Sequence, residues 1–133
     1  MGDRIEYPTR EKVIEYNFLA LTIIKVKKAD QARVLNPHKI DSAIDECRKT
    51  KGGIHDKAVS LLRHLIQKHP FASRNRRTAF IVTKEFLLNN HATFGVKDDP
   101  TYARAMQGIC EDYYAQKEIK EWIKYGKIRK FER

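Results

Sequence analysis

Residues 56–90 read DKAVSLLRHLIQKHPFASRNRRTAFIVTKEFLLNN, and this stretch predicts two helices joined by a short reversal of the chain. In its first half, apolar residues recur three and four positions apart, which is the spacing of one helix face. The second half is apolar around most of its circumference, as expected of a helix that is buried on most sides. Between them, Pro70 ends one helix and Asn75 can cap the next. We therefore expect helices over about 56–68 and 75–88, with the second at the centre of a bundle.

The rest of the chain also has helical periodicity, with few glycines or prolines and no sustained alternation. Further helices are expected over about 9–24, 37–48, 100–113 and 116–123, the third of these with an Asp at its N-cap and Pro100 at its first position. Residues 18–26 are rich enough in β-branched side chains to form a strand instead, so both structures remain open there. The whole pattern predicts an all-α fold, a compact helical bundle around a buried central helix.

The bulk composition indicates one globular domain with a strong positive charge. The chain has 133 residues, of which 41% are hydrophobic and 33% charged. Lys and Arg number 27 against 17 Asp and Glu, which gives a formal net charge of +10. This sign favours polyanionic partners, namely nucleic acid, a nucleotide or an acidic protein surface. Scattered lysines are also commonly no more than a solvated surface.

Cysteine usage and the hydropathy pattern predict a cytoplasmic protein. Cys47 and Cys110 match neither a zinc-ligand spacing nor a redox pair, and such free thiols favour a reducing setting. Residues 1–6 lack the apolar core of a signal peptide. The longest apolar stretch, residues 18–24, is too short to span a bilayer, so we expect no membrane association.

The connection HPFASRNRRTA, residues 69–79, carries the residues best suited to chemistry. Histidine is a side chain suited to proton transfer near neutral pH, so His69 can accept a proton from a hydroxyl. Phe71 is apolar within a polar loop, so it should point inward and anchor that loop. Arg76 and Arg77 stand at a helix N-terminus, where cations oppose the helix dipole unless an anion lies between them. We interpret the stretch as a catalytic, anion-binding loop; the alternative is an ordinary helix connection with a surface histidine.

The same stretch resembles the signature of the Fic/Doc family, in particular its death-on-curing (Doc) branch. That signature is roughly His-x-Phe-x-acidic-small-Asn-(Gly or Lys)-Arg-Thr-Ala, and residues 69–79 match seven of its positions in order. The similarity continues back through residues 56–62 and forward to Asn90. The resemblance implies that residues 1–133 form a single Fic/Doc-like helical domain.

Fic/Doc proteins transfer part of a nucleotide to a protein hydroxyl. The resemblance therefore implies ATP as the cofactor and a protein Ser or Thr as the acceptor. By position, His69 would be the base that deprotonates the hydroxyl, and Asn75 and Arg77 would hold phosphates beside loop amides. A cation at position 76, here Arg76, is similar to the Doc branch, and Phe80 stands where adenylyl-transferring members carry a second arginine. Both point to a toxin-type enzyme that phosphorylates a translation factor, with adenylylation as the other possibility.

Two residues of the predicted phosphate-binding set depart from the family pattern. Ser73 stands where the family usually has the Asp or Glu that binds Mg²⁺. A hydroxyl is a poor substitute for that carboxylate, so we expect no metal ligand at this position. Arg74 stands where a small residue lets the backbone approach phosphate, and its guanidinium either obstructs the site or replaces part of the metal's charge. The full predicted set is Ser73, Arg74, Asn75, Arg76 and Arg77.

Two questions of regulation and function stay open at this level. Residues 42–46 match only the start of the family's inhibitory-helix motif, since Cys47 follows instead of Gly or Asn. We interpret them as an ordinary helix face, in which case restraint would come from an antitoxin partner. The competing function is a catalytically degenerate Fic/Doc-fold protein that acts as a basic binding module for nucleic acid or an acidic protein. The basic tail, residues 124–133, supports this alternative, although no helix-turn-helix signature accompanies it.

Overall fold

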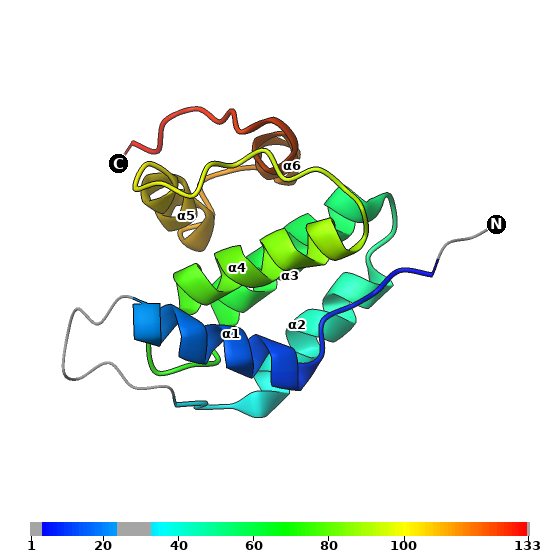
Figure 1. Cartoon of the computed structure of the whole chain (residues 1–133). Coiled ribbons are helices and arrows are strands. Elements are labelled where there is room, and N and C mark those ends of the chain that lie inside the picture. Colours follow the sequence, from blue (N-terminus) through cyan, green and yellow to red (C-terminus); the bar gives the residue numbers. More distant parts are fainter. Residues whose placement is uncertain (1–3, 24–32, 133) are drawn as a thin grey trace.

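A computed structural model of the chain describes residues 4–23 and 33–132, which form six α-helices (Figure 1). No strand forms within these residues, where a single isolated bridge joins Val34 to Phe71. The all-α prediction is therefore confirmed for the described part of the chain. In chain order the helices are α1 (Arg10–Ile23), α2 (Pro37–Lys49), α3 (Ile54–Lys68), α4 (Asn75–Asn89), α5 (Tyr102–Cys110) and α6 (Gln116–Tyr125).

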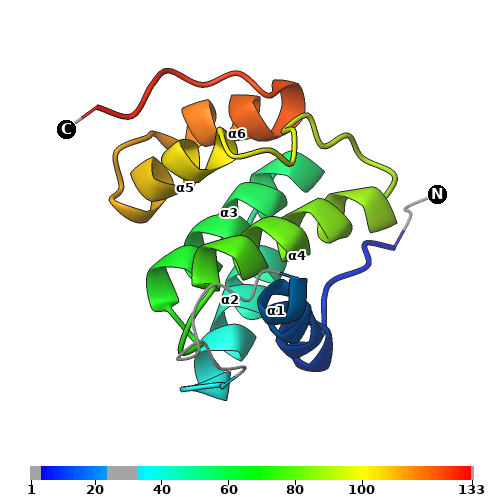
Figure 2. The same ribbon diagram turned by 60° about the vertical axis from the view of Figure 1, so that its left-hand side comes forward.

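The helices are arranged around the α3–α4 pair. Figures 1 and 2 show α1 and α2 on one side of this pair and α5 and α6 on the other. Helix α4 is buried on most sides, as expected, but α3 has the wider set of neighbours, because it packs against α2, α4, α5 and α6. The buried residues of α4 are Thr78, Ala79, Phe80, Val82, Thr83, Phe86 and Leu87. Those of α2 are the predicted stripe of Ile40, Ala43, Ile44 and Cys47.

The starts of α1 and α2 follow from local capping. The Thr9 hydroxyl accepts a hydrogen bond from the backbone N–H of Lys12 at 3.1 Å, so Thr9 caps α1 as predicted. Asn36 caps α2 in the same way, because its side-chain oxygen accepts from the N–H of His38 at 3.0 Å. Pro37 occupies the first helical turn, where its missing N–H costs nothing.

The prediction that α5 begins at Pro100, with an Asp as its N-cap, is wrong by two residues, since the helix begins at Tyr102. The side chain of Asp99 accepts a hydrogen bond from the backbone N–H of Thr101 at 2.9 Å, which stabilises a turn in place of a first helical turn. Residues 98–101 are therefore part of a linker that connects α4 to α5. This shift places Asp98 opposite the start of α4, which matters for the site described below.

The strand alternative for residues 18–26 is excluded where the structure describes it, because residues 18–23 are helical. Residues 24–32, which include the last part of this stretch, lie outside the described part of the chain. Among the helices of the two described segments, none is both long enough and apolar enough to cross a membrane.

Candidate functional site

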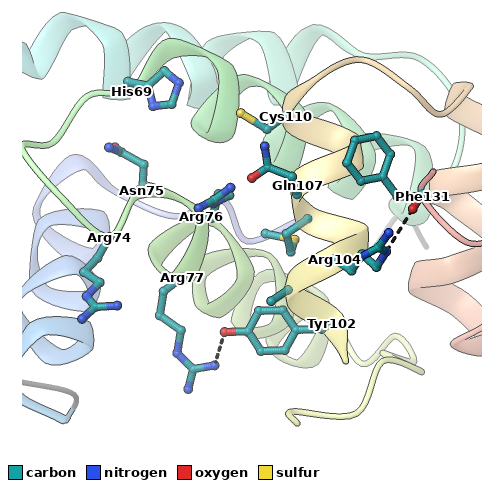
Figure 3. Close-up of a pocket in the computed structure, with 12 residues that line it drawn as sticks. His69, Arg74, Asn75, Arg76, Arg77, Tyr102, Arg104, Gln107, Cys110 and Phe131 are labelled. Atoms are coloured by element: carbon teal, nitrogen blue, oxygen red, sulfur yellow. Dashed lines mark hydrogen bonds between the residues drawn. The ribbon is translucent and has the colours of Figure 1, made fainter. Parts of the chain in front are cut away.

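A cleft of about 1030 Å³ lies between the start of α4 and one face of α5 (Figure 3). It brings together the predicted base and four of the five predicted phosphate-binding residues, whereas Ser73 is not part of its wall. No Asp or Glu of the described chain lines it. The lining residues are His69, Arg74, Asn75, Arg76, Arg77, Tyr102, Ala103, Arg104, Met106, Gln107, Cys110 and Phe131.

The loop between α3 and α4 is held from inside by Phe71 and Asn75. Phe71 is 2% exposed, so this aromatic points into the core, where the sequence places a loop anchor. The Asn75 side-chain oxygen accepts from the Phe71 N–H at 3.0 Å, and its amide nitrogen donates to the Phe71 carbonyl at 2.9 Å. Both polar ends of the Asn75 side chain are therefore engaged with the backbone, and in this conformation they position the loop.

His69 ends α3 with a left-handed backbone conformation, at φ 47° and ψ 61°. Histidine tolerates this region better than most side chains do, and the following Pro70 disfavours continuation of the helix. The side chain of His69 is exposed and lies across the cleft from Cys110 (Figure 3). The imidazole is thus placed where an incoming hydroxyl can reach it.

The first turn of α4 presents free backbone donors. Arg74 precedes the helix in a left-handed conformation, at φ 60°, and its side chain makes no cap. The first intrahelical bond runs from the Thr78 N–H to the Arg74 carbonyl at 2.9 Å. No described residue accepts a hydrogen bond from the N–H groups of residues 75–77. Together with the helix dipole, these donors favour an anion at this end of the cleft.

Arg77 is already paired with a carboxylate of the protein. Its two terminal nitrogens donate to the Asp98 oxygens at 2.7 and 3.2 Å, and one of them also donates to the Tyr102 hydroxyl at 2.8 Å. The bonds to Asp98 raise the pKa of Arg77 above its ordinary value and lower that of Asp98. Asp98 thus offsets the cost of Arg77 at a helix N-terminus. Arg76 is exposed and has no hydrogen-bond or ion-pair partner among the described residues.

Asn17 of α1 is a positioning residue that the sequence reasoning did not single out. It is 1% exposed, and its amide nitrogen donates to the Ser73 carbonyl at 3.0 Å and to the Thr78 hydroxyl at 3.0 Å. These two bonds fasten both the loop and the start of α4 to α1. A signal existed in the sequence, because Asn17 is a polar residue at the helical spacing of the apolar face of α1.

The far wall of the cleft comes from α5 and the C-terminal tail, and no motif in the sequence marks it. Tyr102 and Gln107 project from α5 towards the loop arginines, whereas Arg104, which also lines the cleft, points towards Phe131 (Figure 3). Phe131 of the tail closes the wall beside them, and its carbonyl accepts from the Arg104 side chain at 2.9 Å. These residues meet the α4 loop only through the tertiary fold.

The donors of the cleft fit phosphate but do not fit Mg²⁺. Arginines, backbone N–H groups and an imidazole line the cleft, and magnesium requires oxygen ligands. The hydroxyl of Ser73 is buried, has no hydrogen-bond partner among the described residues and lies outside the cleft wall. Within the described ranges, no three His, Cys, Asp or Glu residues are grouped so that they could hold a metal ion.

Comparison with known proteins adds no assignment. No protein-family model matches the chain, and no curated protein matches it. The Fic/Doc resemblance of residues 56–90 therefore remains a prediction, and function has to be argued from the geometry of the cleft.

We predict that Asn17→Ala lowers the free energy of unfolding by about 1–3 kcal/mol, because it leaves the Ser73 carbonyl and the Thr78 hydroxyl without a buried donor. Ser73→Ala is the comparison variant. It removes a buried hydroxyl that has no partner, so its stability should stay within about 0.5 kcal/mol of the parent or rise. Urea unfolding followed by circular dichroism measures both, and equal losses in the two variants would contradict the role of Asn17.

We also predict that Asp98→Asn raises the affinity for inorganic pyrophosphate, measured by calorimetry without magnesium. Removal of this carboxylate releases the fork of Arg77 for the anion, and the expected gain is about fivefold. Asp99→Asn is the matched control, because it removes the same charge one residue away from a side chain that bonds to Thr101. An equal gain in both variants would mean that only the overall charge matters.

Proposed function

We propose that the cleft binds the phosphates of a nucleotide and that the protein transfers a phosphoryl or adenylyl group to a Ser or Thr hydroxyl of another protein. The observation that supports this proposal is the convergence of an exposed imidazole and an anion-binding helix start in one cleft. Transfer from a phosphate ester requires an acceptor that loses a proton and a leaving group whose charge is stabilised. In this proposal the imidazole of His69 serves the acceptor, and the start of α4 beside it stabilises the leaving group.

In the proposed step, the imidazole of His69 takes the proton of the acceptor hydroxyl. The hydroxyl oxygen forms a bond to phosphorus while the bond from phosphorus to the leaving oxygen breaks, and the leaving group departs with that electron pair. The leaving group is the nucleoside diphosphate in phosphoryl transfer and pyrophosphate in adenylyl transfer. Arg76 and the N–H groups of residues 75–77 stabilise the developing charge.

Arginine, and not a metal, supplies the positive charge in this proposal. Because the donor set does not fit Mg²⁺, no step is assigned to that ion. Arg74, Arg76 and Arg104 all line the cleft, and guanidinium groups match phosphate oxygens in pairs. The acceptor protein, a translation factor by analogy with Doc, and restraint by a separate antitoxin belong to the same proposal.

A second candidate function is a catalytically degenerate, basic binding module for nucleic acid or an acidic protein. One observation favours it: the two side chains assigned to phosphate by the resemblance, Asn75 and Arg77, are both bonded within the protein. Such a module binds polyanions with an affinity that falls steeply as salt rises, and it does so without help from His69. Transfer assays separate the two functions.

We predict that the protein moves radiolabel from ATP to a protein acceptor and that His69→Asn abolishes the transfer. Asparagine is the chosen replacement because it tolerates the left-handed backbone of this position and cannot act as a base at neutral pH. His38→Asn, an exposed site at the start of α2, is the control and should behave as the parent does.

Parallel reactions with label at the α or the γ phosphate decide which group moves. Label from the γ position alone indicates a kinase, and label from the α position indicates an adenylyltransferase. The proposal fails if neither label reaches protein from any lysate or purified translation factor, or if His69→Asn transfers as fast as the parent.

We further predict that ATP protects Cys110 from iodoacetamide. Cys110 lines the cleft, so occupancy should slow its alkylation about threefold or more when ATP exceeds its dissociation constant. Cys47 is the internal control, since burial raises the pKa of its thiol to about 12 and keeps it unreactive. Peptide mass spectrometry gives both rates. An unchanged Cys110 rate at saturating ATP would place the nucleotide outside this cleft.

A further inference from the structure

A second groove adjoins the cleft on the other side of Tyr102, Arg104 and Phe131, which line both. Its volume is about 850 Å³, and its walls are the linker of residues 95–101 and the tail of residues 126–131, above α5 and α6. Neither wall segment is helical apart from a turn, so the groove lies between two stretches of irregular backbone.

Two glycines lie where these walls approach each other, beside the end of α6. The Gly95 N–H donates to the Ile123 carbonyl at 2.7 Å, and the Gly126 N–H donates to the Trp122 carbonyl at 2.7 Å. A Cβ on Gly95 would lie 2.5 Å from the Lys124 carbonyl oxygen, and one on Gly126 would lie 2.5 Å from the Gly95 oxygen. Only glycine permits this approach of the two backbones, so these two residues allow the segments that form the groove to lie close together.

The tail is held in place by some of its backbone groups, while others remain without a hydrogen-bond partner among the described residues. Its carbonyls at Arg129 and Phe131 accept from the side chains of Tyr114, at 2.8 Å, and Arg104, at 2.9 Å. By contrast, no described residue hydrogen-bonds the backbone groups of Lys127 or Lys130. Unpaired N–H and C=O groups along a held segment of chain are what an added peptide strand uses for binding.

The ratio of cations to carboxylates is higher in this groove than in the chain as a whole. Five cations line it against a single carboxylate, that of Asp99. Glu118 neutralises one of the five, Arg129, whereas Lys127 and Lys130 have no ion-pair partner in the described part of the chain. The floor is aromatic, with the buried Trp122 beneath it. An occupant should therefore combine acidic side chains with apolar ones.

We propose that this groove binds an extended acidic segment of the protein substrate, with its apolar side chains against the aromatic floor and its carboxylates beside the two tail lysines. The inference rests on the proposed function, because it supplies a docking site next to the cleft where the acceptor hydroxyl must arrive. A nucleic acid fits less well, since a phosphodiester linkage can accept hydrogen bonds from the N–H groups of the tail but has no donor for its carbonyl groups, whereas a peptide has both.

The test uses a fluorescein-labelled peptide of repeated Glu-Val-Glu-Leu and measures its anisotropy together with the emission of Trp122, the one tryptophan of the chain. The peptide should bind and shift that emission. The double variant Lys127→Glu/Lys130→Glu should weaken binding about tenfold. Lys39→Glu/Lys51→Glu carries the same charge change on exposed residues away from the groove and should weaken binding less than about twofold.

Two further probes decide what kind of ligand the groove takes. A repeated Glu-Gly peptide of equal charge should bind at least about tenfold more weakly, because it lacks apolar anchors. The proposal is overturned if the two double variants weaken binding equally, if the Glu-Gly peptide binds as well, or if oligothymidylate of equal charge binds more tightly. The assay contains no nucleotide, so label transfer from ATP reports on the cleft independently of the groove.

Discussion

The geometry of the cleft depends on the pair of hydrogen bonds between the Asn75 side chain and the backbone of Phe71. These bonds close the loop on itself while the Phe71 ring is fixed in the core. The carbonyl of Pro70 is in turn bonded by the N–H groups of residues 35 and 36, which ties the loop to the segment before α2. This turn positions the groups on the loop side of the cleft. A small change in the turn would therefore move the imidazole of His69 and the start of α4 together.

Electrostatics explains why an arginine-rich helix start is tolerated in the folded protein. Asp98 balances Arg77 directly, and the rings of Phe80 and Tyr102 lie 5.7 Å from its guanidinium carbon. The remaining cations of the cleft face a wall that contains no carboxylate in the described chain. In the proposed function, a phosphate would therefore compete with Asp98 for Arg77 but would meet no such competitor at Arg76 among the described residues.

The sequence was a good guide to local features and a poor one to contacts between distant segments. Periodicity and capping residues predicted the helices because those signals act within a few residues; α5 was misplaced because the turn at Asp99 competes with a helix start. His69 and the arginines were found because they share one short stretch. The partnership of Arg77 with Asp98 spans 21 residues and leaves no local pattern. Ser73 illustrates the same limit, since its carbonyl is bonded by Asn17, 56 residues away in the chain.

The adjacency of α3 and α4 in the chain also bears on how the protein folds. These two helices are connected by the short loop of residues 69–74. Their packing therefore costs little loop-closure entropy and can form early. The remaining wall of the cleft involves residues as far away as Phe131 and can form only after the whole C-terminal half has docked. We therefore expect the anion-binding half of the site to be present in a folding nucleus before the cleft exists. During synthesis, that half would emerge exposed and positively charged, ahead of the segments that later cover it.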